Sequence, residues 1–275
     1  MPRPVITFLS DFGPAAPAVC RGVMFGIAPD ANVIDISHQV TRYAIADGAG
    51  TLVFALPHMP VGVHVAVVDP GVGTERLGLA LRVKRGDVLI GPDNGLLIDA
   101  AEALGGIVGA RSIENRELML PVISSSFHGR DVFSPVAAHL AMGTPFESVG
   151  PEVPIARLVR LPVPKPTVLR GELETEVVHI LVFGNVTLAG TPADLDAALG
   201  TVRPGDRLAV EFEPFDGRTG TTEVTTWEKT FGLVPFGASL LMADSEGWLS
   251  FADNQGNAAA RLGLSLGQRA SIRRA

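Results

Sequence analysis

The sequence has 275 residues, of which 47% are hydrophobic and 19% are charged, and its formal net charge is −7. This composition supplies enough apolar material for one large or two modest cores and excludes a disordered chain. The acidic balance argues against a nucleic-acid-binding protein and favours a small cationic or neutral substrate.

The first 155 residues alternate short apolar runs with segments of helical spacing. Strands are predicted at 5–9, 32–37, 64–69, 79–83 and 87–91, and helices at 18–28, 43–56, 94–104 and 130–143. Strands that alternate with helices indicate an α/β domain, over residues 1–155, whose mostly parallel sheet is covered on both faces.

A proline-rich segment follows, with five prolines in residues 151–166. Proline disfavours both a helix interior and a central strand, so we interpret residues 156–168 as an extended linker. From there on, short β-type runs recur between Gly, Asp and Asn residues. This spacing predicts a smaller antiparallel β-barrel domain over residues 169–275.

Two acidic residues stand at the ends of predicted strands in the first domain. Asp11 follows the first strand, and Asp69 ends the third. Ligands of open α/β sheets bind beyond the carboxyl ends of the strands, where a carboxylate can accept hydrogen bonds from a ribose diol or hold a water. The alternative interpretation is an ordinary turn or capping aspartate.

The segment VVDPGVGTER (67–76) runs from a strand into a glycine-rich turn. Gly71 and Gly73 would let the backbone approach a ligand closely. Arg76 stands where a dinucleotide loop would have its third glycine, so phosphate binding is rejected. We expect Arg76 to place a positive charge near Asp69, the alternative being a surface salt bridge.

A histidine opens the next polar segment, SSSFHGRDVFSP (124–135). His128 precedes the predicted helix, a position at which an isolated histidine is more often structural than catalytic. Asp93 or Asn94, in PDNGLL (92–97), is the expected N-cap of the helix that follows.

The second domain carries aromatic residues and amides that would suit an adenine ring. Phe183 and Asn185 belong to FGN, Phe231 to KTFG, and Trp248 to SEGWLSFADNQGN. An aromatic face can stack on the base while an amide recognises its edge. Each of these aromatic residues could equally be part of the core.

Six motifs occur in order along nearly the whole chain: FLSDFG, VVDPGVGTER, PDNGLL, SFHGRDVFSPVAAHL, FGN and SEGWL. Together they resemble the S-adenosylmethionine (SAM) hydroxide adenosyltransferases, or SAM hydrolases, which are related to the fluorinases and chlorinases. The resemblance implies an enzyme that splits SAM with water into adenosine and methionine, without a metal or organic cofactor. It also implies a homotrimer whose active sites lie between the N-terminal domain of one subunit and the C-terminal domain of the next.

The same resemblance assigns roles to individual residues. Asp69, Arg76 and His128 match the catalytic triad that positions water or hydroxide, and Asp11 matches the acid that binds the ribose hydroxyls. The remaining substrate contacts are adenine-binding Phe183, Asn185 and Phe231, methionine-binding Ser245 and Glu246, and the nearby Trp248.

Two positions separate this chain from the halogenases. Halogenases have tyrosine in place of Asp69, and the fluorinase has serine in place of Gly129. Because an ionised Asp69 repels a halide at close range, water is the expected nucleophile. A halogenase and a non-catalytic sensor of adenosine or SAM are the two alternative functions.

The chain departs from the family pattern at the methionine end. Ala16 and Leu181 stand where relatives have aspartates, and Arg21 replaces a lysine. Glu246 could compensate for one lost carboxylate. The family is associated with clearing the (R)-sulfonium epimer of SAM, a preference that these residues alone do not determine.

The remaining expectations concern location. Cys20 is the single cysteine, so no disulfide can form within the chain. The first apolar run is too short for a signal peptide, and no uninterrupted apolar stretch reaches membrane-spanning length. We therefore expect a cytoplasmic protein that binds neither nucleic acid nor membrane.

Overall fold

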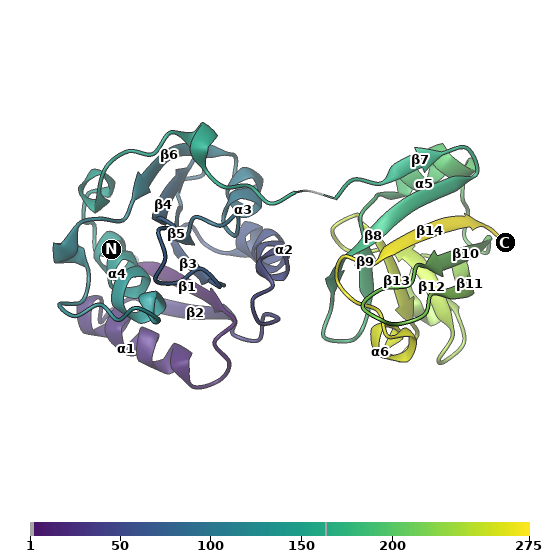
Figure 1. The fold of residues 1–275 in the computed structure, drawn as a ribbon, viewed down its shortest axis with the longest axis horizontal. Coiled ribbons are helices and arrows are strands. Elements are labelled where there is room, and N and C mark those ends of the chain that lie inside the picture. The colour runs from purple at the N-terminus through teal and green to yellow at the C-terminus, as the bar shows by residue number, and fades with distance from the viewer. Residues whose placement is uncertain (1–2, 163) are drawn as a thin grey trace. The chain divides into compact units, whose positions relative to one another are not determined.

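The computed structural model describes residues 3–162 and 164–275. Met1, Pro2 and Val163, which fall in the predicted first domain and linker, lie outside the described residues. The chain divides into two compact units between Leu161 and Pro162, within the segment interpreted as a linker (Figure 1). Each unit is described by itself.

The first unit is built on a six-stranded sheet with the order β2-β1-β3-β5-β4-β6. Its strands are β1 (Val5–Ser10), β2 (Asn32–Ser37), β3 (Val63–Val67), β4 (Gly78–Val83), β5 (Val88–Pro92) and β6 (Ile107–Ser112). The pairs β1–β2, β1–β3 and β3–β5 are parallel, whereas β4 runs antiparallel to β5 and β6. The predicted mostly parallel sheet is confirmed.

Helices cover both faces of this sheet (Figure 1). The longer ones are α1 (Ala16–Ile27), α2 (Ile45–Ala55), α3 (Ile98–Ala103) and α4 (Ser134–Ala141). Helices α1 and α4 pack together in one buried apolar cluster with residues such as Phe8 and Val65, and α2 and α3 share the other with residues such as Leu81 and Leu89. Short turns of helix are η1 (Leu56–His58), η2 (Arg116–Leu118), η3 (Gly129–Phe133), η4 (Phe146–Val149) and η5 (Ile155–Arg157).

Three local features of this unit differ from the prediction. Helix α3 starts at Ile98 rather than 94, and neither predicted cap residue caps it. Instead Asn94 donates from Nδ2 to the Val68 carbonyl, and Asp93 accepts a hydrogen bond from the Val159 amide. Strand β6 was not predicted, and the predicted helix at 130–143 opens with a π-helical turn, η3, before α4 begins.

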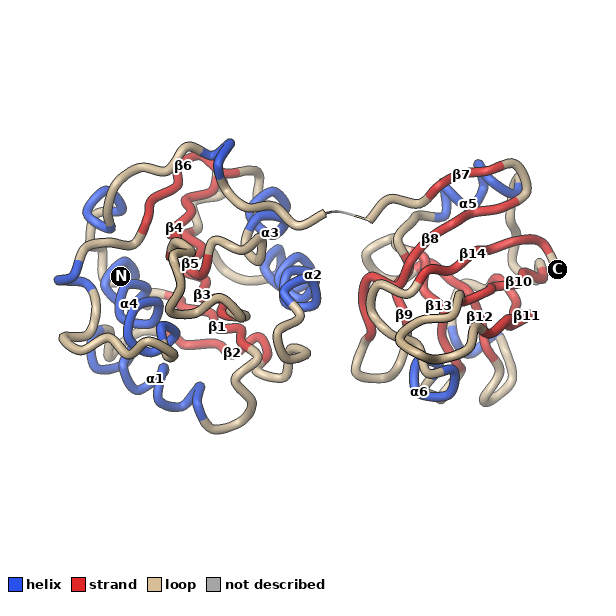
Figure 2. The backbone as a smooth tube through the Cα atoms, in the orientation of Figure 1, coloured by secondary structure: helices blue, strands red, loops and turns tan. Residues whose placement is uncertain are grey.

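The second unit is a seven-stranded barrel with one further edge strand (Figure 2). The order is β14-β10-β11-β12-β13-β9-β8, and pairing of β14 with β8 closes it, while β7 pairs only with β8. The strands are β7 (Thr167–Leu169), β8 (Glu172–Ile180), β9 (Val186–Leu188), β10 (Arg207–Phe212), β11 (Thr221–Trp227), β12 (Ser239–Ala243), β13 (Leu249–Asp253) and β14 (Arg269–Arg274). Within residues 164–275, β11–β12 is the one parallel pair and the other strand pairs are antiparallel, so the predicted antiparallel barrel is confirmed.

The second unit also contains short helices that were not predicted (Figure 2). They are α5 (Pro192–Leu199), α6 (Ala258–Leu262) and the turn η6 (Phe231–Leu233). Helix α5 begins with a reciprocal capping box in which Thr191 accepts from the Asp194 amide and Asp194 accepts from the Thr191 amide. In the part of the chain that the structure describes, no helix has the length and apolarity needed to cross a membrane.

A buried polar chain crosses the first sheet near the start of β5. Thr7 Oγ1 contacts His64 Nδ1 at 2.9 Å, and His64 Nε2 contacts Asp87 Oδ1 at 2.9 Å. Asp87 also accepts hydrogen bonds from Arg85 and from the Gly62 amide. Burial alone would raise the pKa of Asp87, but these hydrogen bonds hold it below its ordinary value. Burial also lowers the pKa of His64. Because both ring nitrogens of His64 have polar partners, we interpret this network as a structural element.

Candidate active site

Asp69 and Arg76 lie at the two ends of the turn that follows β3. Arg76 Nε donates to Asp69 Oδ1 and Oδ2, each at 3.0 Å, and Arg76 Nη2 also donates to Oδ2. The Asp69 side chain is 4% exposed and that of Arg76 13% exposed, so the ion pair is shielded from water. Such a bidentate pair fixes the carboxylate in one orientation. Arg76 therefore forms an ordered ion pair with Asp69 rather than an exposed salt bridge.

His128 joins this pair through Arg76 Nη2, the nitrogen that also donates to Asp69 Oδ2. Arg76 Nη2 lies 3.0 Å from His128 Nδ1. A guanidinium can only donate, so Nδ1 must be the acceptor and the neutral ring carries its hydrogen on Nε2. Burial lowers the pKa of His128, as does the charge of Arg76, against the opposing charges of Asp69 and Asp131. The structure thus brings together all three residues that were predicted to form the triad.

The two loops that carry the triad touch at Gly73. Its backbone has φ +77°, and a Cβ there would lie 2.3 Å from the Ser125 carbonyl oxygen. Only glycine fits both the positive φ and this close approach. We expected Gly73 to let the backbone approach a ligand, but in the structure it lets the backbone approach Ser125. This contact packs the 69–76 turn against the loop before His128.

Asp11 directly follows β1 and is held by a residue that the sequence did not single out. Its Oδ2 accepts a hydrogen bond of 3.0 Å from the backbone N–H of Tyr43. Tyr43 adopts φ +64°, a left-handed conformation that costs a non-glycine residue about 1 kcal/mol or more. No sequence signal marks Tyr43, because its contribution is made by the backbone.

The second unit presents two groups of predicted residues on loops. Phe183 is 74% exposed in the turn before β9, in which the Leu181 amide donates to the Asn185 carbonyl. Ser245 and Glu246 are exposed in the turn between β12 and β13, together with the 39% exposed Trp248. Asp244, which was not predicted, orders this second turn because its Oδ1 accepts from the Glu246 and Trp248 amides.

These two turns stand at opposite ends of one strand pair. In the β13–β9 pair, Val186 faces Phe251 and Leu188 faces Leu249. The turn containing Asn185 precedes Val186, whereas the turn containing Trp248 precedes Leu249. Trp248 is thus grouped with Ser245 and Glu246, and not with Asn185. Phe231, in η6, packs against Leu240 and Met242 of β12 and Ala252 of β13.

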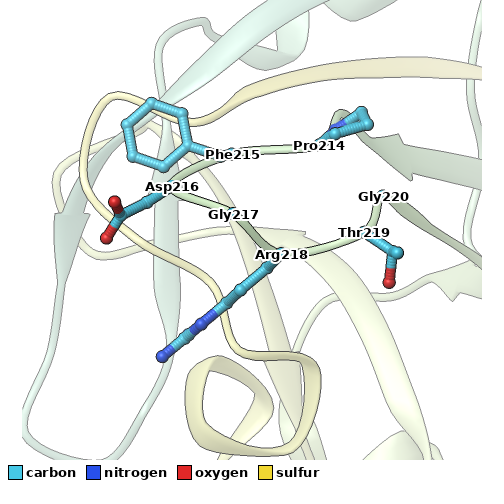
Figure 3. A pocket seen from close by; sticks show the side chains of 7 residues that line it. All are labelled: Pro214, Phe215, Asp216, Gly217, Arg218, Thr219 and Gly220. Carbon is cyan, nitrogen blue, oxygen red and sulfur yellow. The ribbon is translucent and has the colours of Figure 1, made fainter.

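Two hollows of the second unit lie elsewhere. One of about 410 Å³ is lined by residues 214–220, and Figure 3 shows that its Phe215, Asp216 and Arg218 side chains all project from this single turn. A second hollow of similar volume lies between β11 and residues 234–239. No predicted site residue lines either one. Across residues 3–162 and 164–275, no group of three His, Cys, Asp or Glu side chains is arranged to hold a metal ion.

Comparison with known proteins gives the family. Residues 6–150 match the SAM hydroxide adenosyltransferase N-terminal domain, and residues 175–271 match the C-terminal domain of the same family. The chain belongs to the SAM hydroxide adenosyltransferase family. Its two matched segments fall in the first and second units, respectively.

Individual proteins that are similar to this chain support the family assignment. It is 41% identical to the "(R)-S-adenosyl-L-methionine hydrolase" of Salinispora tropica, over 98% of each chain. A crystal structure of an uncharacterized conserved protein from Thermotoga maritima, 36% identical, matches with a TM-score of 0.85 over 98% of this chain and 100% of that one. The fluorinase of Actinopolyspora mzabensis is more distant, at 27% identity over 99% of this chain and 98% of its own.

Proposed function

We propose that this protein is a hydrolase that splits SAM into adenosine and methionine. The observation that carries the proposal is the Asp69–Arg76–His128 cluster beside the carboxyl end of β3, in a chain that is 38–41% identical to relatives named (R)-SAM hydrolases. Ligands of parallel sheets bind at that edge. We also propose a cytoplasmic location, since an unpaired cysteine suits a reducing compartment.

The reaction would be an in-line displacement at the ribose C5′. The oxygen of water forms a bond to C5′, the C5′–sulfur bond breaks, and its electron pair neutralises the sulfonium to give methionine. The water loses a proton, so adenosine carries a hydroxyl at C5′. The sulfonium is a good leaving group and needs no general acid. Alignment of the reactants can supply up to about 7–11 kcal/mol of the barrier reduction.

The hydrogen bonds of the triad divide its tasks. Arg76 uses the single lone pair of His128 Nδ1, whereas the Asp69 carboxylate has about four acceptor sites and keeps capacity beside its bonds to Arg76, so we assign acceptance of the water's proton to Asp69. The Nε2–H of neutral His128 is a donor and would stabilise the developing hydroxide. Arg76 would orient both partners. This division gives each residue of the expected water-positioning triad its own task.

The substrate contacts complete the proposal. Asp11, oriented by the Tyr43 amide, would accept hydrogen bonds from the ribose hydroxyls. Phe183, Asn185 and Phe231 would contact adenine, and Ser245, Glu246 and Trp248 the methionine end. The location of two of these groups at opposite ends of the β13–β9 pair supports this assignment, because the adenine and the amino acid are the two ends of SAM.

We further propose a homotrimer whose sites combine the first unit of one subunit with the second unit of the next. Exposed apolar side chains at and near the predicted adenine contacts in the sequence support an intersubunit site. Val182 and Phe183 are largely exposed, as is Phe236 in the connection between β11 and β12. Large exposed apolar side chains are what an interface or a ligand site would cover.

The test is turnover in isotopically labelled water. The purified protein should convert SAM to methionine and adenosine with one labelled oxygen, at C5′, and the (R)-sulfonium epimer should react faster than the (S) epimer. Adenosine without label, or 5′-chloroadenosine formed in the presence of chloride, would contradict the proposal. Tight binding of SAM without turnover would instead support a sensor.

The pH dependence of the reaction follows from His128. Its pKa lies below the ordinary 6.5, so the ring stays neutral at pH values at which a free histidine is already protonated. Protonation would place a hydrogen on Nδ1 and repel Arg76. We therefore expect kcat/KM to be level above pH 6.5 and to fall on the acid side with a midpoint below that value.

The matched control is His128→Asn, whose amide oxygen can accept from Arg76 but does not titrate. This variant should lose the acidic limb of the kcat/KM profile, measured from about pH 5 to 8. An unchanged limb in His128→Asn would assign the titration to another group.

A further inference from the structure

A contact between Phe12 and Gly129 connects two parts of the proposed site. Phe12 follows Asp11, and Gly129 follows His128. A Cβ atom on Gly129 would lie 2.7 Å from Cζ and 2.8 Å from Cε2 of Phe12, well inside van der Waals contact. The tip of the Phe12 ring therefore rests directly on the backbone of Gly129.

The Phe12 ring is held in this place by other aromatic rings. It meets Phe127 edge to face, with ring centroids 5.5 Å apart, and Phe8 in the same manner at 6.3 Å. Phe8 is fully buried in the core beneath the sheet. Such edge-to-face pairs stabilise the rings beyond the burial of their surface. The ring thus has a preferred position set by the core.

The backbone on the other side of the contact is equally constrained. Asp131 Oδ2 accepts from both the amide and the hydroxyl of Ser124, each at 2.8 Å. The Asp131 amide donates to the Phe127 carbonyl, and Ser134 Oγ donates to the Gly129 carbonyl at 2.6 Å. The segment around His128 cannot shift without breaking these bonds.

We propose that Phe12 is a positioning residue that sets the placement of Asp11 relative to His128 through its contact with Gly129. The inference rests on the proposed function, in which Asp11 binds the ribose and His128 belongs to the triad. The ring acts as a spacer between two backbone segments, each of which carries a functional side chain at the adjacent position. A side chain at residue 129 and a full ring at residue 12 therefore exclude each other.

The test is a double-mutant cycle of Gly129→Ser and Phe12→Leu. The serine should displace the ring and lower kcat about a hundredfold with KM little changed, because misplacement of reacting groups by about 1 Å costs that much. Leucine lacks the ring tip, so the double variant should recover at least about tenfold of the lost kcat. If the loss of kcat in the double variant equals the product of the losses in the two single variants, the proposal is overturned.

A second readout makes the outcome independent of SAM hydrolysis. In Gly129→Ser, the imidazole of His128 should move away from Arg76, so its pKa, measured by NMR titration, should rise toward the ordinary value. In the double variant the pKa should fall back to that of the wild type. An unperturbed His128 in Gly129→Ser would contradict the inference even if the enzyme is active. If the wild-type protein shows no turnover, this titration still decides the inference while the proposed function fails.

Two further variants control for a general effect of an added side chain and for a failure to fold. Gly26→Ser, in α1, places a side chain where nothing lies within 4 Å, and it should leave both readouts unchanged. If Gly129→Ser does not fold, Gly129→Ala tests the same contact with a single added carbon, and the same rescue by Phe12→Leu is expected.

Discussion

The Asp69→Asn variant is expected to lose about a thousandfold in kcat, within the range that general-base catalysis contributes. Asparagine keeps the size of the side chain but removes the charge that Arg76 binds and the carboxylate that would take the proton. Its amide nitrogen would also point a donor at the guanidinium. Steady-state turnover of SAM by the folded variant measures the loss.

The control for this variant is Asp30→Asn, which changes an exposed aspartate of the same unit and should leave kcat unaffected. If Asp69→Asn retained kcat within about tenfold of the wild type, Asp69 would have no role as the base.

The same variant also tests the proposed intersubunit site. Co-expressed with Asn185→Ala chains, it should give mixed trimers in which about a quarter of the sites combine two intact halves. Mixed assemblies as inactive as either variant alone would place each site within one chain.

Replacing Asp87 with alanine is expected to destabilise the first unit by about 3–5 kcal/mol, the usual cost of removing one partner of a buried ion pair. The change would leave His64 Nε2 and the Gly62 amide without their acceptor and would remove the carboxylate that Arg85 binds. Because Asp87 is fully buried, water cannot replace these bonds without opening the sheet. Thermal unfolding should report a decrease in Tm of roughly 6–20 °C.

Asp30→Ala provides the matched control, since it deletes an exposed carboxylate from the same unit and should change Tm little. Asp87→Asn should lie between the two, because its amide oxygen can still accept one hydrogen bond. Equal Tm values for Asp87→Ala and Asp30→Ala would show that the buried polar chain does not stabilise the fold.

The sequence predicted the parts of the fold that periodicity determines. The buried runs at residues 5–9 and 64–69 became β1 and β3, and the helical spacing at 43–56 became α2. Strand β9 was missed because its three residues carry little periodic signal. Helix α6 was missed because its five residues span less than two helical turns. Helix α5 was missed for a different reason, since its capping box uses Asp194 instead of the usual glutamate or glutamine.

The site was predicted less evenly. Asp69, Arg76 and His128 were found through motifs, and the structure adds the direction of their hydrogen bonds, which the sequence cannot give. Tyr43 and Asp244 were missed because they act through a backbone amide and through a turn. Phe12 was missed because its partner is a glycine, and a pattern of residue types does not show which space a ring fills.

The register of the β13–β9 pair has a consequence for ligand selection. The two turns that border it are separated by a fixed number of strand residues, each of which advances the chain by about 3.3 Å. Under the proposed function, the length of this strand pair sets the distance between the residues that contact adenine and those that contact methionine. Inserting two residues into both strands would keep every side chain on its original face while moving the turns about 7 Å further apart. Homologues or designs that differ there in strand length should prefer adenosyl sulfonium compounds with shorter or longer tails.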